Sequence, residues 1–124
     1  MGAFTVQFEI GNQEGERWLS LEGLVDTGST YTWVPRDSLE RLSIAPQFTR
    51  DFETADGRVI TRDLAVALAR FEGQTLPTLV VFADQGDSAL LGVVTLEEFG
   101  LDVDTVNREL MPVRGLAMRR RALP

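Results

Sequence analysis

The residues of this chain best suited to chemistry are Asp26, Thr27, Gly28 and Ser29, which follow one another directly after an apolar run. The chain of 124 residues contains no cysteine and no histidine. This excludes thiol nucleophiles, disulfides, histidine acid/base catalysis and the usual zinc sites. Any catalysis must therefore use carboxylates, hydroxyls, arginine or the backbone, and we expect neither a cofactor nor a metal.

Asp26 stands between two strand-like apolar segments, where burying an unpaired charge is expensive. A lone solvated carboxylate is a poor base for water. Two carboxylates at hydrogen-bond distance cannot both ionise, so they share a proton, and one can act as base while the other acts as acid. Such a pair needs a small residue beside each acid and a hydroxyl that fixes the loop. Asp26-Thr27-Gly28 supplies one half of it.

A second half could come from the same chain or from another copy. The only other candidate in the sequence is Asp84-Gln85-Gly86, which has Gln85 where Thr or Ser is wanted and falls where a turn is needed. It remains the weaker alternative, because a chain of 124 residues is too short for two domains that each supply one acid. We predict that the second acid is Asp26 of another copy, in a homodimer with two-fold symmetry.

Composition narrows the class of protein. The length and the apolar content of 44% fit one globular domain. The net charge of −7 argues against a nucleic-acid partner. No apolar run approaches the ~20 residues of a membrane span, and no secretory signal pattern opens the chain. We expect a soluble, cytoplasmic protein, and we interpret Arg119, Arg120 and Arg121 as part of a solvated tail.

The elements that position Asp26 are predicted to be strands. Residues 4–10 alternate apolar and polar side chains, as in a half-buried strand, and residues 17–25 form the second arm of a hairpin. That arm ends at Asp26. A third strand is predicted at residues 30–34, and a short helix at residues 35–42.

Two more hairpins are predicted in the middle of the chain. Asp56-Gly57 is a strong turn signal between residues 48–54 and 58–61, and we expect this polar hairpin to project into solvent. Residues 64–71 and 76–83 favour a second hairpin, although the alanine-rich first segment also suits a helix. We interpret the tryptophans and most phenylalanines as core rather than as a binding platform.

The remaining elements are expected in this order: a polar loop at 84–88, an apolar segment ending in glycine at 89–92, a short helix at 95–99, and strands at 101–104 and 109–113. Thr95 is the predicted N-cap of the helix. We assign residues 1–113 to the domain and residues 114–124 to an arginine-rich tail.

Residues 24–30, Leu-Val-Asp-Thr-Gly-Ser-Thr, resemble the active-site motif of aspartic proteases, and the short chain resembles their retroviral-type, retropepsin-like branch. The Ala-Leu-Leu-Gly segment, the helix and the closing strands resemble later parts of the family pattern, and the Asp56-Gly57 hairpin lies where the family places its flap. The match covers residues 4–113. It implies a mainly all-β fold, a small closed β-barrel with one or two short helices.

The resemblance also implies roles for the residues of the motif. Asp26 would be the catalytic acid, Thr27 would hold the two active-site loops together, and Gly28 would approach the substrate backbone. A hydroxyl at Ser29 can donate to the carboxylate and favour its charged form, from which we expect an acidic activity optimum.

The candidate flap consists of Ala55, Asp56, Gly57 and Arg58, and its charged tip departs from the glycine-rich retroviral pattern. The implied function is an aspartic endopeptidase that acts on proteins or peptides as a homodimer, with residues 101–113 at the interface. The alternative is a catalytically inactive dimerisation or peptide-binding module of the same fold.

Overall fold

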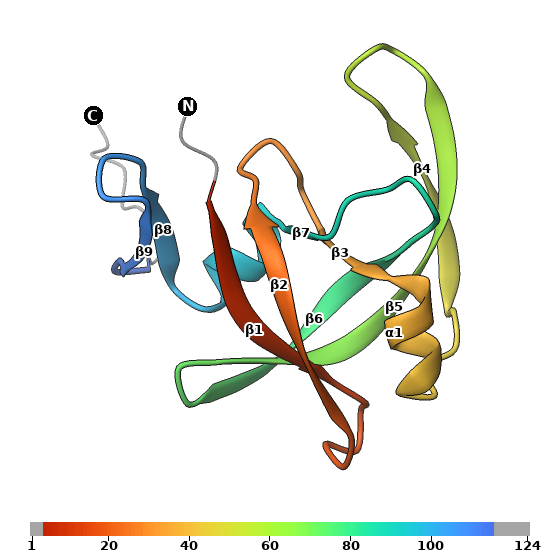
Figure 1. The fold of residues 1–124 in the computed structure, drawn as a ribbon, viewed down its shortest axis with the longest axis horizontal. Helices are drawn as coiled ribbons and strands as arrows, with labels where there is room; N and C mark the ends of the chain where they lie inside the picture. The colour runs from red at the N-terminus through yellow and green to blue at the C-terminus, as the bar shows by residue number, and fades with distance from the viewer. Residues whose placement is uncertain (1–3, 116–124) are drawn as a thin grey trace, which may run out of the picture.

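The computed structural model describes residues 4–115, which form nine strands and two short helices (Figure 1). The elements are β1 Thr5–Gly11, β2 Trp18–Val25, β3 Thr32–Pro35, α1 Arg36–Arg41, β4 Phe48–Glu53, β5 Val59–Phe71, β6 Gln74–Ala83, β7 Leu90–Leu91, α2 Val93–Glu98, β8 Leu101–Asp104 and β9 Glu109–Pro112.

Seven strands form one sheet in the order β1-β2-β7-β3-β6-β5-β4, and β1 also pairs with β5. The sheet therefore returns on itself as a ring, while β8 and β9 form a separate two-stranded sheet beside it (Figure 1). The three predicted hairpins, β1–β2, β4–β5 and β5–β6, all form antiparallel pairs. The predicted all-β, barrel-like fold is confirmed.

The interior of the ring is filled by apolar side chains from most strands. Ile10, Val34, Val80 and Phe82 are fully buried there. From the helix predicted at 35–42, Leu39 and Leu42 both reach this core. Burying apolar surface is the main favourable term in folding, so the alternating pattern of the strands decides which face turns inward.

β5 is one strand of 13 residues, where the sequence indicated two segments or a helix. Its alanines at 65, 67 and 69 are at most 1% exposed, and the residues between them are only half-buried. That period of two excludes the helix. The strands predicted at 58–61 and 64–71 leave out Arg62 and Asp63, but both charged residues lie within β5, where each has an ion-pair partner.

The helix near residue 95 begins two residues earlier than predicted, and Thr95 is not its N-cap. Gly92 is the N-cap residue, and Thr95 lies inside the helix with 2% of its surface exposed. No side chain caps the first turn. The N–H groups of Val93 and Val94 instead donate to backbone oxygens of the segment after Asp26, which satisfies donors that a helix start leaves open.

No helix within residues 4–115 is both long and apolar enough to cross a membrane. The arginine run at 119–121 lies outside the described residues. The domain boundary placed after residue 113 stays a prediction.

Candidate active site

Asp26 follows β2 directly, and its loop crosses the end of another strand. β2 and β3 are consecutive in the chain but lie on either side of β7 in the sheet. Residues 26–31 make this crossing, the orange loop above the arrowhead of β2 in Figure 1. The Asp26 N–H donates to the Leu91 carbonyl at 3.2 Å. The acid is therefore fixed by its backbone to the strand that its own loop passes over.

The Asp26 carboxylate is held in one orientation by its own loop. The Gly28 N–H donates to Asp26 Oδ1 at 2.8 Å, and the Ser29 N–H donates to the Asp26 carbonyl at 3.1 Å. A Cβ at position 28 would lie 3.2 Å from Oδ1, which is tighter than ordinary van der Waals contact, so glycine gives this approach room. Asp26 is half-buried, whereas Thr27 and Gly28 are exposed. The carboxylate is thus rigidly placed and close to solvent.

Ser29 does not donate to the carboxylate, contrary to the role suggested for it. Its hydroxyl donates to the Tyr31 carbonyl at 2.8 Å. Within one copy of the chain, Ser29 therefore closes the loop on itself.

The glycine of the Leu-Leu-Gly segment meets the Asp26 loop directly. An added Cβ at Gly92 would lie 2.3 Å from the Tyr31 carbonyl oxygen. Next to it, the Val93 N–H donates to the Ser29 carbonyl and the Val94 N–H to the Thr30 carbonyl, each at 2.9 Å. The two motifs of the sequence form one unit, in which the start of α2 holds the loop.

Three buried threonines support this unit, and sequence reasoning missed them. The Thr95 hydroxyl lies 2.6 Å from that of Thr32 and 2.8 Å from that of Thr78. Thr32 Oγ1 also accepts the Gly92 N–H at 3.0 Å. In the sequence each is only a hydroxyl residue among apolar residues, and this pattern does not predict which residues the hydroxyl bonds to.

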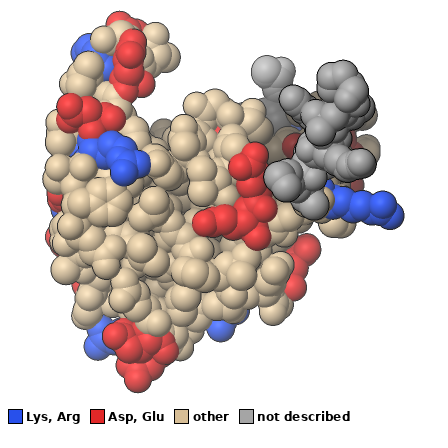
Figure 2. Space-filling view, turned by 180° about the vertical axis from the view of Figure 1, so that it is seen from behind, with Lys and Arg blue, Asp and Glu red and all other residues tan. Residues whose placement is uncertain are grey.

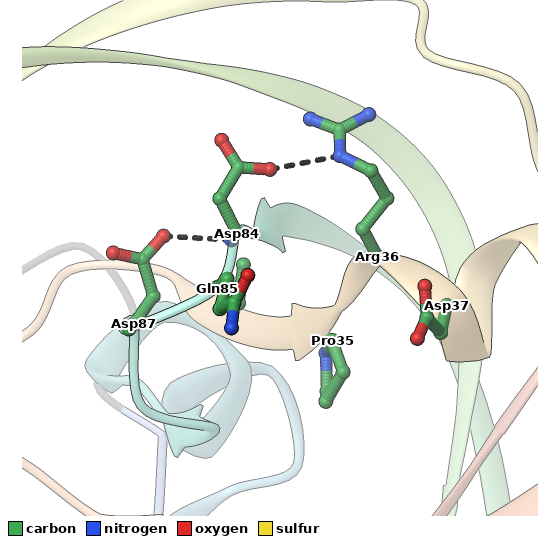
Figure 3. Close-up of a pocket in the computed structure, with 8 residues that line it drawn as sticks. Pro35, Arg36, Asp37, Asp84, Gln85 and Asp87 are labelled. Carbon is green, nitrogen blue, oxygen red and sulfur yellow. Dashed lines mark hydrogen bonds and ion pairs between the residues drawn. The ribbon is translucent and has the colours of Figure 1, made fainter.

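The alternative acid, Asp84, forms ion pairs with arginine side chains. Figure 3 shows its carboxylate turned toward Arg36, whose Nε lies 2.8 Å from Oδ1. Arg36 also pairs with Asp63 at 3.0 Å. Arg62 pairs with Asp87 at 2.8 Å and with Asp84 at 3.5 Å. Arg36, Asp84 and Asp87 line an open pocket beside α1, and the ion pairs hold the loop after β6. Each oxygen of the Asp84 carboxylate therefore has an arginine partner.

The loop after β6 keeps its ion pair in moderately acid solution. The hydrogen bond from Arg62, opposed by burial, holds the pKa of Asp87 below its ordinary value of 3.8. A carboxyl whose pKa is lowered on folding stabilises the fold above its unfolded pKa. That contribution is lost only as the pH falls from about 3.8 through the lower folded value.

The candidate flap is the end of the β4–β5 hairpin, which extends from the ring (Figure 1). In Figure 2 it forms the arm at the upper left, with a hollow between it and the rest of the molecule. Ala55, Asp56, Gly57 and Arg58 are all exposed, as predicted. The tip is ordered by itself: Thr54 bonds to Asp56, and Arg58 pairs with Asp56 at 3.2 Å. The Thr54 hydroxyl and Arg58 lower the pKa of Asp56.

The comparison with known families bears on this geometry. A family model described as Aspartyl protease matches residues 6–95, which include the Asp26 loop, the hairpin and Gly92. The chain belongs to the aspartyl protease family. The matched residues include both the Asp26 loop and the start of α2, which are hydrogen-bonded to each other in the structure.

The fold is similar to that of a solved retroviral protease. The solution structure of simian foamy virus (mac) protease aligns with a TM-score of 0.54 and 22% identity, covering 77% of this chain and 94% of that one. This likeness concerns the fold. No curated protein sequence matches the chain. The family model confirms the predicted aspartic protease family, and this likeness confirms the predicted retropepsin-like fold.

Within residues 4–115, no group of three or more Asp and Glu side chains is arranged to hold a metal ion. The acidic residues that do meet, such as Asp84 and Asp87, are paired with arginine.

Proposed function

We propose that this protein is an aspartic endopeptidase whose active site forms between two copies of the chain, with Asp26 of each copy as a catalytic acid. The observation that carries the proposal is the Asp26 carboxylate itself. It accepts a hydrogen bond from the Gly28 N–H at 2.8 Å, and its loop is hydrogen-bonded to the start of α2. Asp26 is only half-buried. The other candidate acid is bound by arginine, so the second carboxylate is best supplied by a second copy.

The pair would act on a water molecule held between the two carboxylates. The ionised Asp26 takes a proton from the water as its oxygen attacks the peptide carbonyl, and the protonated Asp26 gives its proton to the carbonyl oxygen. The tetrahedral species then breaks its C–N bond: one Asp26 carboxyl gives its proton to the leaving amine, and a hydroxyl of the tetrahedral carbon returns its proton to the other carboxylate. Loops that are already rigid need little reorganisation during these steps. One shared proton is required, so we expect a rate maximum below neutral pH.

The surface beside Thr27 supports association of two copies. A groove next to it is lined by Thr27, Val93, Leu96, Glu97, Leu101, Asp102 and Val113. Met111 of β9 and Val113, which directly follows that strand, are 39% and 43% exposed. Exposed apolar side chains beside an active-site loop are typical of an interaction site. A two-fold axis near Thr27 would bring the two Asp26 loops together and cover this groove.

The substrate we propose is a protein or peptide bound in an extended conformation. The hollow under the β4–β5 hairpin would receive it (Figure 2), and the hairpin would close over it and exclude water.

The decisive variant is Asp26→Asn, compared with the wild type and with Asp37→Asn, which removes an exposed carboxylate on α1. We expect Asp26→Asn to lower kcat by about 10³-fold or more, since the amide can neither accept nor share the proton. Dimerisation and Asp37→Asn activity are expected to match the wild type. Cleavage of a peptide mixture is measured between about pH 3 and 7, and the dimer by sedimentation.

Cleavage by Asp26→Asn at the wild-type rate would remove Asp26 from the mechanism. A wild-type rate maximum clearly above neutral pH would contradict the shared proton. If neither form cleaves and both dimerise, the catalytically inactive dimerisation or peptide-binding module becomes the better assignment.

A further inference from the structure

The outer part of the β4–β5 hairpin, next to its tip, contacts the segment that carries the catalytic loop through aromatic rings. The Phe52 ring on β4 lies 6.2 Å from the Tyr31 ring, edge to face at 86°. It also lies 5.2 Å from the Trp33 ring. Arg50, two residues earlier on the strand, donates to the Tyr31 hydroxyl, and its guanidinium lies 5.6 Å from the Tyr31 ring centre.

Tyr31 is also part of the catalytic loop through its backbone. Its carbonyl oxygen accepts the Ser29 hydroxyl at 2.8 Å and lies so close to Gly92 that no Cβ could fit between them. One residue therefore joins the two structures: its backbone closes the Asp26 loop, and its side chain binds the hairpin.

These contacts are not those of an ordinary core. Tyr31, Trp33 and Phe52 are half-buried, and Arg50 is exposed, so their packing contributes less to the fold than that of the ring interior. Edge-to-face pairs and arginine over an aromatic ring are directional. They fix an angle between two elements, which a nonspecific apolar contact does not.

We propose that Tyr31, with Phe52 and Arg50, is a positioning contact that sets how the hairpin lies over Asp26. The inference rests on the proposed peptidase function. None of the three residues is assigned to the reacting atoms. With residues 50–52 held in this way, closure over a substrate requires movement of only the tip beyond them, which is ordered by its own bonds. Without the contact, substrate binding must also order this outer part of the hairpin, at a cost in affinity.

The test replaces Phe52 by Ala. We expect KM to rise about tenfold while kcat changes less than about threefold, because binding and not chemistry is impaired. Tyr31→Phe keeps the ring but removes the hydroxyl that Arg50 binds, and we expect a smaller rise in KM. Adding Arg50→Ala to Tyr31→Phe is expected to cost less than the sum of the two single effects, since both remove the same hydrogen bond.

A matched control is Arg70→Ala. It also removes an arginine from an aromatic ring, 3.9 Å from the Trp18 ring centre, on the part of β5 that pairs with β1. We expect its KM to equal that of the wild type. Thermal unfolding of every variant shows whether it is folded under the assay conditions.

Amide hydrogen exchange tests the contact without any activity. In Phe52→Ala we expect faster exchange in residues 48–62 and unchanged exchange in β1 and β2, since only the hairpin is released. Wild-type exchange in the hairpin of the folded variant would overturn the inference, as would equal KM values for Phe52→Ala and Arg70→Ala. A wild type that cleaves nothing would instead refute the proposed function, and the exchange result would still decide this contact.

Discussion

Gly92 determines how closely α2 can approach the catalytic loop. Its backbone angles, φ −96° and ψ 174°, are open to any residue, so the requirement for glycine is one of space. An added Cβ would meet the backbone oxygens of Tyr31 at 2.3 Å and Thr30 at 3.0 Å. Backbone atoms cannot swing aside as a flexible side chain can, so the loop or the helix start would have to move.

We therefore expect Gly92→Ala to lose about 1–3 kcal/mol of stability and most of its cleavage activity, because the loop that orients Asp26 would be displaced. Urea unfolding and the cleavage rate measure the two effects. Gly115→Ala is the control, because a Cβ there meets nothing within 4 Å. Wild-type stability and activity in Gly92→Ala would mean that the loop can shift without consequence.

At the scale of elements, a buried hydroxyl of α2 joins the helix to β3 and β6. Thr95 Oγ1 lies within 2.8 Å of the hydroxyls of both Thr32 and Thr78, and all three residues are at most 2% exposed. Thr95→Val has nearly the same shape but removes the shared partner, which leaves a buried hydroxyl unpaired. We expect a loss of about 1–3 kcal/mol in the free energy of unfolding.

Thr95→Ser, which keeps the hydroxyl and lacks the methyl group, distinguishes the contributions of these two groups to stability. It keeps the bonds, so denaturant unfolding is expected to show a smaller loss than in Thr95→Val. The reverse order would assign the stabilisation to apolar packing of the methyl group.

At the scale of the molecule, association has to overcome like charge. Each copy carries a net charge of −7, and the groove beside Thr27 includes Glu97 and Asp102. Salt screens such repulsion, since the Debye length falls from about 30 Å at about 0.01 M to about 10 Å at about 0.1 M. We expect the dimer dissociation constant at neutral pH to fall several-fold over this range, measured by sedimentation.

Asp102→Asn removes one charge at the proposed interface, and Glu14→Gln removes one in the exposed turn between β1 and β2. We expect the first to strengthen the dimer at low salt more than the second. Equal effects would place the interface elsewhere, and a dimer weakened by salt would indicate that attraction between charges holds it.

Much of the fold could be predicted because its signals are local. Alternation along β1 and β2 and the Asp56-Gly57 turn each depend on neighbouring residues. The Asp-Thr-Gly segment and the Leu-Leu-Gly segment identified the family, which the match over residues 6–95 confirms. The role of Asp26 as the catalytic acid remains a prediction.

Only the tertiary structure decided what these residues touch. Thr95 looked like a helix cap, but its partners lie 63 and 17 residues away in the chain. Asp84 looked like half of an acid pair, but it is paired with Arg36, 48 residues before it. The sequence by itself determined the elements and the chemistry available at Asp26, because propensity and turn chemistry act over a few residues. Long-range partners depend on strand order, here on β7 lying between β2 and β3. Local sequence patterns do not predict that order.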